Sequence, residues 1–222
     1  MIFGEDVRDE RYPFGRFDGV IGGPPCQAFS VLKRVHSFLG VQEKFGNLIP
    51  EFERVVGEVS PTWFLMENVR HAPIPQVTGY IVTSTLVRDV WVGGETLRLR
   101  RFSFGSLTRR RFEVEWVALH RPDPEVSVLA GGGSRSMSIK IGGSGKPKRY
   151  GNSGRRTAIG RGGDSKQKFL EGLIQQGLPA HFLERAPFTL RGKCEAIGNG
   201  VPRAMGLAIA KAVKRAMYVD PA

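Results

Sequence analysis

Cys26 is one of only two cysteines in the chain, and it follows a short apolar segment, residues 17–21, whose pattern predicts a buried strand. Gly22-Gly23-Pro24-Pro25 ends that strand, so the thiol is predicted to lie just past its C-terminal end. In open α/β sheets this edge binds ligands, and a thiolate there would be a nucleophile. An unpaired cysteine is also commonly a small buried apolar residue, and the pattern alone does not separate these two interpretations.

A carboxylate ends the next predicted strand, residues 62–67, whose last residue is Glu67. Between the two strands, residues 48–59 carry apolar side chains at helical spacing and predict a helix. Alternation of strands and helices favours a parallel α/β sheet. Taken alone, Glu67 would be interpreted as a carboxylate that caps the turn after its strand.

The remaining elements are predicted from two other patterns. Alternating residues between 80 and 119 predict a pair of strands, with Phe112, Val114 and Trp116 on one face. A short helix is predicted from residue 168, and Pro202 is predicted to open a helix. That last helix has one apolar face, formed by Met205, Ile209, Ala212, Val213 and Ala216.

Charge is the most unusual feature of the composition, with a net charge of +12 in 222 residues. Residues 131–163 hold eight Lys and Arg residues, no acidic residue and many glycines. Such a segment favours a polyanionic partner, above all nucleic acid, although a solvated linker is the alternative interpretation. The sequence shows no apolar segment long enough to cross a bilayer and no signal peptide, and its two cysteines make no disulfide framework. We therefore expect a cytoplasmic protein without membrane contact.

Four short motifs follow one another in a fixed order: Pro25-Cys26-Gln27, Glu67-Asn68-Val69, Thr108-Arg109-Arg110-Arg111, and Gly198-Asn199-Gly200-Val201-Pro202. In this order they resemble the PCQ, ENV, QxRxR and GNxVP motifs of the DNA cytosine-5 methyltransferases. The resemblance extends over about residues 4–214, and the family's glutamine is Leu107 here. It implies a Rossmann-like, S-adenosylmethionine-dependent methyltransferase fold of the α/β class. It also implies bacterial or phage origin, and the role stays open between restriction-modification, phage self-protection and neither.

The resemblance assigns a catalytic role to four residues. Cys26 is the implied nucleophile, which adds to carbon 6 of a flipped cytosine so that carbon 5 can take a methyl group. Glu67 is implied to contact the exocyclic amine and ring nitrogen 3 of that base. Arg109 and Arg111 are implied to supply positive charge beside the cysteine and the nucleotide. Considered without the resemblance, these two arginines would be a solvated strand face.

S-adenosylmethionine is the implied cofactor, held by residues that match the family's cofactor segments: Asp6, Val7, Pro25, Leu48, Asn199, Gly200 and Val201. The family's glycine-rich first turn and its ribose-binding acid have no counterpart here, and Gly4-Glu5-Asp6-Val7 resembles the third cofactor segment. We therefore expect an N-terminally truncated fold. Three explanations stay open: a second polypeptide supplies the first segments, the chain is a degenerate copy, or another local arrangement replaces them.

Double-stranded DNA is the implied substrate, and a catalytically inactive DNA-binding remnant is the alternative function. By the resemblance, residues 1–120 are part of the catalytic core, 121–165 are a small irregular basic target-recognition region, and 166–222 return to the core. The DNA-binding residues are predicted to be Gln27, Ser30, Lys146, Lys148, Arg149, Arg155 and Arg156. The four histidines show no metal-ligand spacing with cysteine, so no metal is predicted, and no role is predicted for Cys194.

Overall fold

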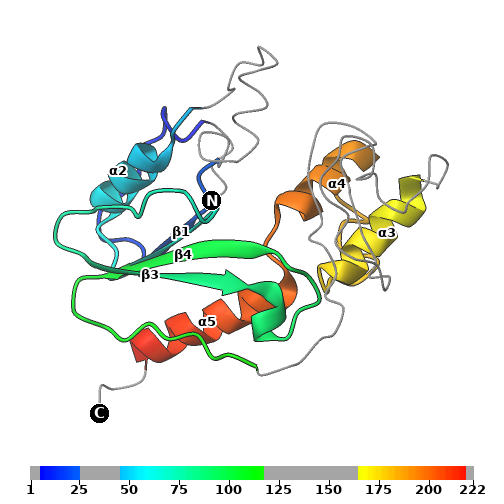
Figure 1. Cartoon of the computed structure of the whole chain (residues 1–222). Coiled ribbons are helices and arrows are strands. Elements are labelled where there is room, and N and C mark those ends of the chain that lie inside the picture. The colour runs from blue at the N-terminus through cyan, green and yellow to red at the C-terminus, as the bar shows by residue number, and fades with distance from the viewer. Residues whose placement is uncertain (1–5, 26–45, 118–164, 219–222) are drawn as a thin grey trace. The chain divides into compact units, whose positions relative to one another are not determined.

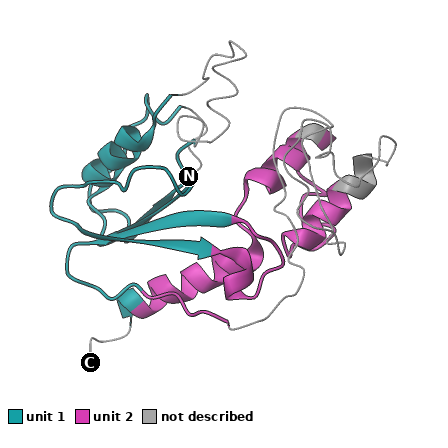
Figure 2. Cartoon of the chain, in the orientation of Figure 1, with its two compact units in different colours: residues 1–87, 99–112, 216–222 teal, residues 88–98, 113–215 magenta. Residues whose placement is uncertain are grey.

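The computed structural model describes residues 6–25, 46–117 and 165–218. Cys26, Gln27, Ser30 and the five basic residues predicted to bind DNA lie outside these described residues. The chain divides into two compact units, which are coloured separately in Figure 2. The first comprises residues 1–87, 99–112 and 216–222, and the second comprises residues 88–98 and 113–215. The predicted functional division into core and target-recognition region stays a prediction.

The first unit is built on a four-stranded sheet of order β1-β2-β4-β3 (Figure 1). Its strands are β1 (Gly19–Gly22), β2 (Trp63–Asn68), β3 (Ile81–Arg88) and β4 (Leu99–Ser106). Strands β1 and β2 are parallel, whereas β4 runs antiparallel to β2. The predicted parallel pair is therefore confirmed, with each strand within two residues of its expected bounds.

Helix α2 (Ile49–Val59) connects the two parallel strands and supplies half of the core. Phe52 from the helix meets Phe64 from β2 edge to face, with ring centroids 5.7 Å apart. Gly105 on β4 allows this packing, because a methyl group built there would lie 2.2 Å from the Phe64 ring. Burial of these aromatic rings fixes the helix on one face of the sheet.

The second unit contains a 3-10 helix η2 (Asp89–Val92), two α-helices, α3 (Ser165–Gln175) and α4 (Leu190–Asn199), and most of α5 (Arg203–Tyr218). Leu173 from α3 and Ile197 from α4 form its small buried cluster. The apolar face predicted for the last helix is confirmed, since all five of its residues are buried. No helix among the described residues is both long and apolar enough to cross a membrane.

The strand predicted near residues 109–119 is not formed in the described part of that segment. Residues 107–117 follow β4 without regular secondary structure. Val114 is buried, but Trp116 is half exposed, so the predicted common apolar face is wrong. A pair of strands is formed within the predicted region by β3 and β4, which are neighbours in the sheet. In β4, all residues from Phe102 to Ser106 are buried.

Candidate functional site

The candidate site lies where β1 and β2 end side by side. Because these strands are parallel, with Gly22 opposite Met66, their C-terminal ends meet at one edge of the sheet. Glu67 follows Met66, and a methyl group built on Gly23 would lie 3.4 Å from Glu67 Oε2. The carboxylate therefore lies against the turn that leads into Pro25 and Cys26. Cys26 itself lies outside the described residues.

Glu67 forms an ion pair with Arg100, in which Nε of the guanidinium lies 2.8 Å from Glu67 Oε1. The antiparallel register explains the pairing, since Glu67 lies opposite Phe102 and Arg100, two residues before Phe102 on β4, is on the same face of the sheet. The two side chains are about four-fifths buried, with exposed fractions of 22% and 20%. Partial burial weakens solvent screening of the ion pair, so this arginine holds the carboxylate in place.

Arg100 could not be recognised as a site residue from the motifs alone. Arg98 and Arg100 have the same Arg-x-Arg spacing as Arg109 and Arg111. This spacing is the one feature of the sequence that could have indicated Arg100 as a site residue. Arg109 and Arg111 come after the end of β4, and both are exposed. Their predicted role beside the cysteine stays a prediction.

Asn68 connects the two strand ends. Its side-chain amide donates a hydrogen bond to the Pro24 carbonyl at 3.2 Å, and its side-chain oxygen accepts one from the Val69 N–H at 2.8 Å. The side chain is 2% exposed. Pro24 lies two residues after the end of β1, so this bond ties the segment before Cys26 to β2.

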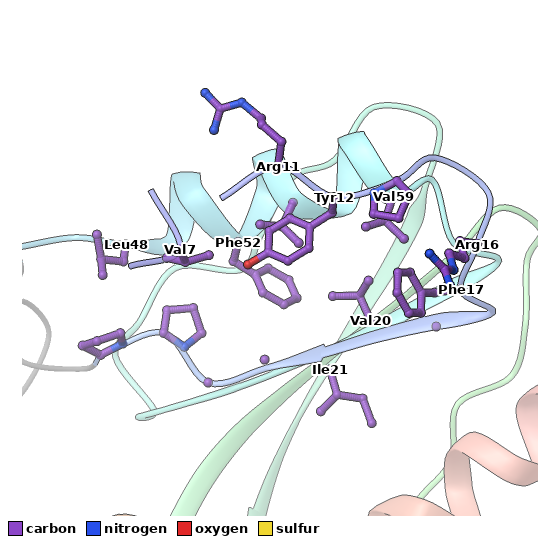
Figure 3. A pocket seen from close by; sticks show the side chains of 17 residues that line it. Val7, Arg11, Tyr12, Arg16, Phe17, Val20, Ile21, Leu48, Phe52 and Val59 are labelled. Atoms are coloured by element: carbon purple, nitrogen blue, oxygen red, sulfur yellow. The ribbon is translucent and has the colours of Figure 1, made fainter. Parts of the chain in front are cut away.

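A mainly apolar cavity of about 800 Å³ lies between α2 and β1 in the first unit. Three of the residues predicted to bind the cofactor, Val7, Pro25 and Leu48, line it. Figure 3 shows Val20, Phe52 and Tyr12 around the same space, with Ile21 on the opposite side of the strand. Apolar walls of this kind suit a flat aromatic group such as adenine.

The segment that carries Val7 is held on helix α2 by Arg54. The guanidinium donates to the Val7 carbonyl at 2.6 Å and forms ion pairs with Glu51 and Glu58, which lie within one helical turn on either side. These hydrogen bonds raise the pKa of Arg54 above its ordinary value. The wall of the cavity is thus positioned by a charged network on the helix surface.

Asp6 precedes this segment and pairs with Arg8. The Arg8 side chain donates to both carboxylate oxygens, and its backbone N–H donates to Oδ1. These hydrogen bonds lower the pKa of Asp6 to about 2, so the carboxylate is charged at neutral pH. An exposed carboxylate of this kind could accept hydrogen bonds from a polar ligand group.

The predicted GNxVP turn lies in the second unit, at the end of α4. Helix α4 ends at Asn199, whose carbonyl accepts a hydrogen bond from Arg98 Nη2 at 3.1 Å, and Gly200 is in an extended conformation. Asn199, Gly200 and Val201 are therefore placed on the last turn of a helix and the segment after it. Their contact with the cofactor stays a prediction.

Cys194 also lies on α4, packed beside the small cluster of the second unit. Burial raises the pKa of its thiol, and the negative charge of Glu195 adds to this effect. A thiol with a raised pKa is a poor nucleophile at neutral pH, in agreement with a structural role. Among the described residues no group of three or more His, Cys, Asp or Glu side chains could hold a metal ion.

Comparisons with known proteins found a family and several relatives that are similar to parts of this chain. Residues 4–74 match the family described as C-5 cytosine-specific DNA methylase, which confirms the resemblance for this part of the chain. The chain is 35% identical over 123 residues to the type II methyltransferase M.NgoPII of Neisseria gonorrhoeae, which is 50% of this chain and 34% of that protein. It is 49% identical over 53 residues to M.AquIA of a Picosynechococcus strain, which is 24% of this chain and 20% of that protein. These two matches span about a third or less of each relative.

The fold resembles solved methyltransferase structures over most of the chain. One neighbour is a protein described as a DNA modification methyltransferase encoded within a prophage (E. coli), with a TM-score of 0.54 and 19% identity over 96% of this chain and 85% of that one. Another is the Entamoeba histolytica methyltransferase EhMeth, with a TM-score of 0.51 and 10% identity over 87% and 75% of the two chains. The predicted methyltransferase fold is thereby confirmed.

Replacing Asn68 by alanine tests the link between the two strand ends. The change leaves the Pro24 carbonyl and the Val69 N–H without their partner, so we expect unfolding free energy to fall by about 1–3 kcal/mol in urea denaturation. Asn47→Ala is the matched control, since Asn47 also accepts a backbone N–H, that of Ile49, but is exposed. Water replaces that bond, so the control should lose less than about 1 kcal/mol. Equal losses in the two variants would contradict the role of Asn68.

Proposed function

We propose that this chain acts as a DNA cytosine-5 methyltransferase, with Cys26 as nucleophile and Glu67 as the group that activates the base. The observation that carries the proposal is the Glu67 carboxylate, held by Arg100 and lying against the turn that leads into Cys26. The family match over residues 4–74 includes both Cys26 and Glu67 and supports the same chemistry.

The reaction requires a nucleophile because carbon 5 of cytosine is too weakly nucleophilic to take a methyl group directly. The Cys26 thiolate adds to carbon 6 and converts the ring into an enamine-like species. Glu67 accepts a hydrogen bond from the exocyclic amine and contacts ring nitrogen 3, which favours protonation of the ring at that nitrogen as carbon 6 is attacked. The target base leaves the helix to reach these groups, at a cost of a few kcal/mol that contacts in the site offset.

S-adenosylmethionine supplies the methyl group when it is bound. The cavity between α2 and β1 fits its adenine, because Val7, Pro25 and Leu48 give it apolar walls. Asp6 lies next to Val7 and provides a charged acceptor for polar groups of the cofactor. Asn199, Gly200 and Val201 are proposed as further cofactor contacts, as the resemblance implies.

A second polypeptide is proposed to complete the cofactor site. In the described sheet β1 is an outer strand, and its Ile21 side chain is 71% exposed. The segment Gly19–Gly22 carries neither a charge nor a proline, which are the usual features that protect an outer strand from pairing. A further strand along this edge would bring a glycine-rich turn to the same end as Pro25 and Glu67.

Covalent trapping tests the assignment of Cys26. With DNA that contains 5-fluorocytosine, the fluorine cannot leave carbon 5 as a proton does, so the adduct through Cys26 should persist. We expect a protein–DNA adduct in denaturing gels when S-adenosylmethionine, and where needed the second polypeptide, are present. Cys26→Ser should abolish the adduct.

Cys194→Ser is the matched control for the trapping experiment, because burial raises the pKa of that thiol and no role is assigned to it. This variant should form the adduct at the wild-type yield. An adduct of equal yield with Cys26→Ser would contradict the assignment, and the absence of any wild-type adduct would favour the inactive DNA-binding alternative.

Binding of the DNA backbone is proposed for the basic segment 131–163. Glutamine substitutions at Lys146, Lys148, Arg149, Arg155 and Arg156 should flatten the plot of log affinity against log salt by roughly 0.9 for each phosphate that the variant no longer neutralises. Affinity should fall about equally for all DNA sequences, since phosphate contacts carry no sequence information. Fluorescence anisotropy between low and moderate salt measures both quantities.

Lys211→Gln with Lys214→Gln on α5 is the control for the loss of charge alone, since both residues are exposed. This control should change the slope less than the substitutions in the basic segment. An unchanged slope in the fivefold variant would show that the segment is a solvated linker, and a loss confined to one DNA sequence would show that it reads bases.

A further inference from the structure

Two exposed tryptophans form a cluster with an arginine in the second unit. Trp91 and Trp116 are 43% and 52% exposed, and their rings meet edge to face with centroids 5.7 Å apart. The guanidinium carbon of Arg88 lies 5.4 Å from the centre of the Trp91 ring. Val117, which is 45% exposed, continues the same surface along the chain. We call these four residues the tryptophan cluster.

The backbone that carries the cluster is fixed by contacts that do not involve the indole rings. The Val117 N–H donates to the Trp91 carbonyl at 2.8 Å. Asp89, which precedes Trp91 in η2, is fully buried and accepts hydrogen bonds through Oδ2 from the Glu95 N–H and from both the N–H and the hydroxyl of Thr96. The rings are therefore held in position while about half of their surface is in contact with solvent.

The segment that carries Trp116 is anchored by Arg215 on α5. The guanidinium pairs with Glu115 at 2.8 Å and donates to the Glu113 carbonyl at 3.0 Å. The Glu115 carboxylate is thus paired with Arg215. Arg88 contributes a positive charge at the tryptophan rings.

We propose that the tryptophan cluster is a surface on which an unpaired nucleobase of bound DNA stacks. This inference rests on the proposed function, because it names a further contact to the same DNA substrate. Aromatic rings and an arginine guanidinium are the groups that stack on bases irrespective of sequence. Charge supports DNA as the occupant, since the chain carries a net charge of +12 and the basic segment begins 14 residues after Val117.

Flipping a base out of a duplex creates the unpaired and unstacked bases that such a surface binds. Ring stacking is short-range and involves no counterion release, so it contributes affinity that does not depend on salt. The tryptophan cluster and the basic segment therefore make separable predictions in the same binding assay.

The test compares three DNA probes of one sequence: a single strand, a duplex with one unpaired base and a fully paired duplex. Trp91→Leu with Trp116→Leu keeps the surface apolar but removes both indole rings. We expect the double variant to bind the first two probes roughly 5- to 150-fold more weakly, the range measured for loss of one stacked base. Affinity for the paired duplex should fall less, because an unpaired base is available there only after flipping, and the salt slope should stay unchanged.

Phe182→Leu is the control for removing an exposed aromatic ring elsewhere in the second unit. Trp91→Phe with Trp116→Phe keeps an aromatic face at each position and should retain most of the binding, which separates stacking from a folding defect. In the wild type, tryptophan fluorescence should be quenched by the single strand, and the leucine variant should lose most of that quenching.

The outcomes separate this inference from the proposed function. If the wild type binds DNA and the leucine variant binds each probe with equal affinity, the stacking surface is overturned and the proposed function is not. An equal loss for all three probes would also overturn it, because the cluster would then not act on unpaired bases. If the wild type bound none of the probes, the proposed function and this inference would both fail.

Discussion

The ion pair between Glu67 and Arg100 is the interaction on which the candidate site depends. Each partner is about four-fifths buried, so neither charge is fully hydrated, and each stabilises the other in its place. The pair exists only because β4 enters the sheet antiparallel to β2, with Asn68 opposite Arg101. A shift of one residue in that register would turn Arg100 to the other face of the sheet and leave the carboxylate without this partner.

The packing of the first unit maintains that register. Phe64 on β2 lies against Gly105 on β4, where a larger residue would collide with the ring, and Trp63 stacks on Phe104 at 6.4 Å. On the other side of β2, Asn68 holds the Pro24 carbonyl and Arg54 holds Val7 on α2. Three segments that are distant in sequence thus converge on one sheet edge, each by a specific contact.

The sequence was sufficient for the parts of the fold that depend on local patterns. The first two strands, the helix between them and the apolar face of α5 follow from periodicity, and Glu67 was placed correctly at the end of its strand. Helix α4 was missed because Leu190–Asn199 carries few apolar residues, and its start depends on a Thr189 side chain that caps the Gly192 N–H.

The place of β4 in the sheet could not be predicted locally. Residues 99–106 and 109–117 both alternate and both were included in the predicted pair of strands, but only the first forms a strand among the described residues. The small size of Gly105 matters because Phe64 packs against it, a contact between residues 41 positions apart in sequence. Arg100 was missed for the same reason, since its role arises from register and not from a motif.

The most direct test of this account is a double-mutant cycle on the rate of adduct formation with 5-fluorocytosine DNA. The rates are measured for the wild type, Glu67→Gln, Arg100→Gln and the double variant. If Arg100 acts by holding the Glu67 carboxylate, each single change slows trapping and the double variant is no slower than Glu67→Gln, giving strong non-additivity. Fully additive losses, or an Arg100→Gln rate equal to that of the wild type, would contradict the account.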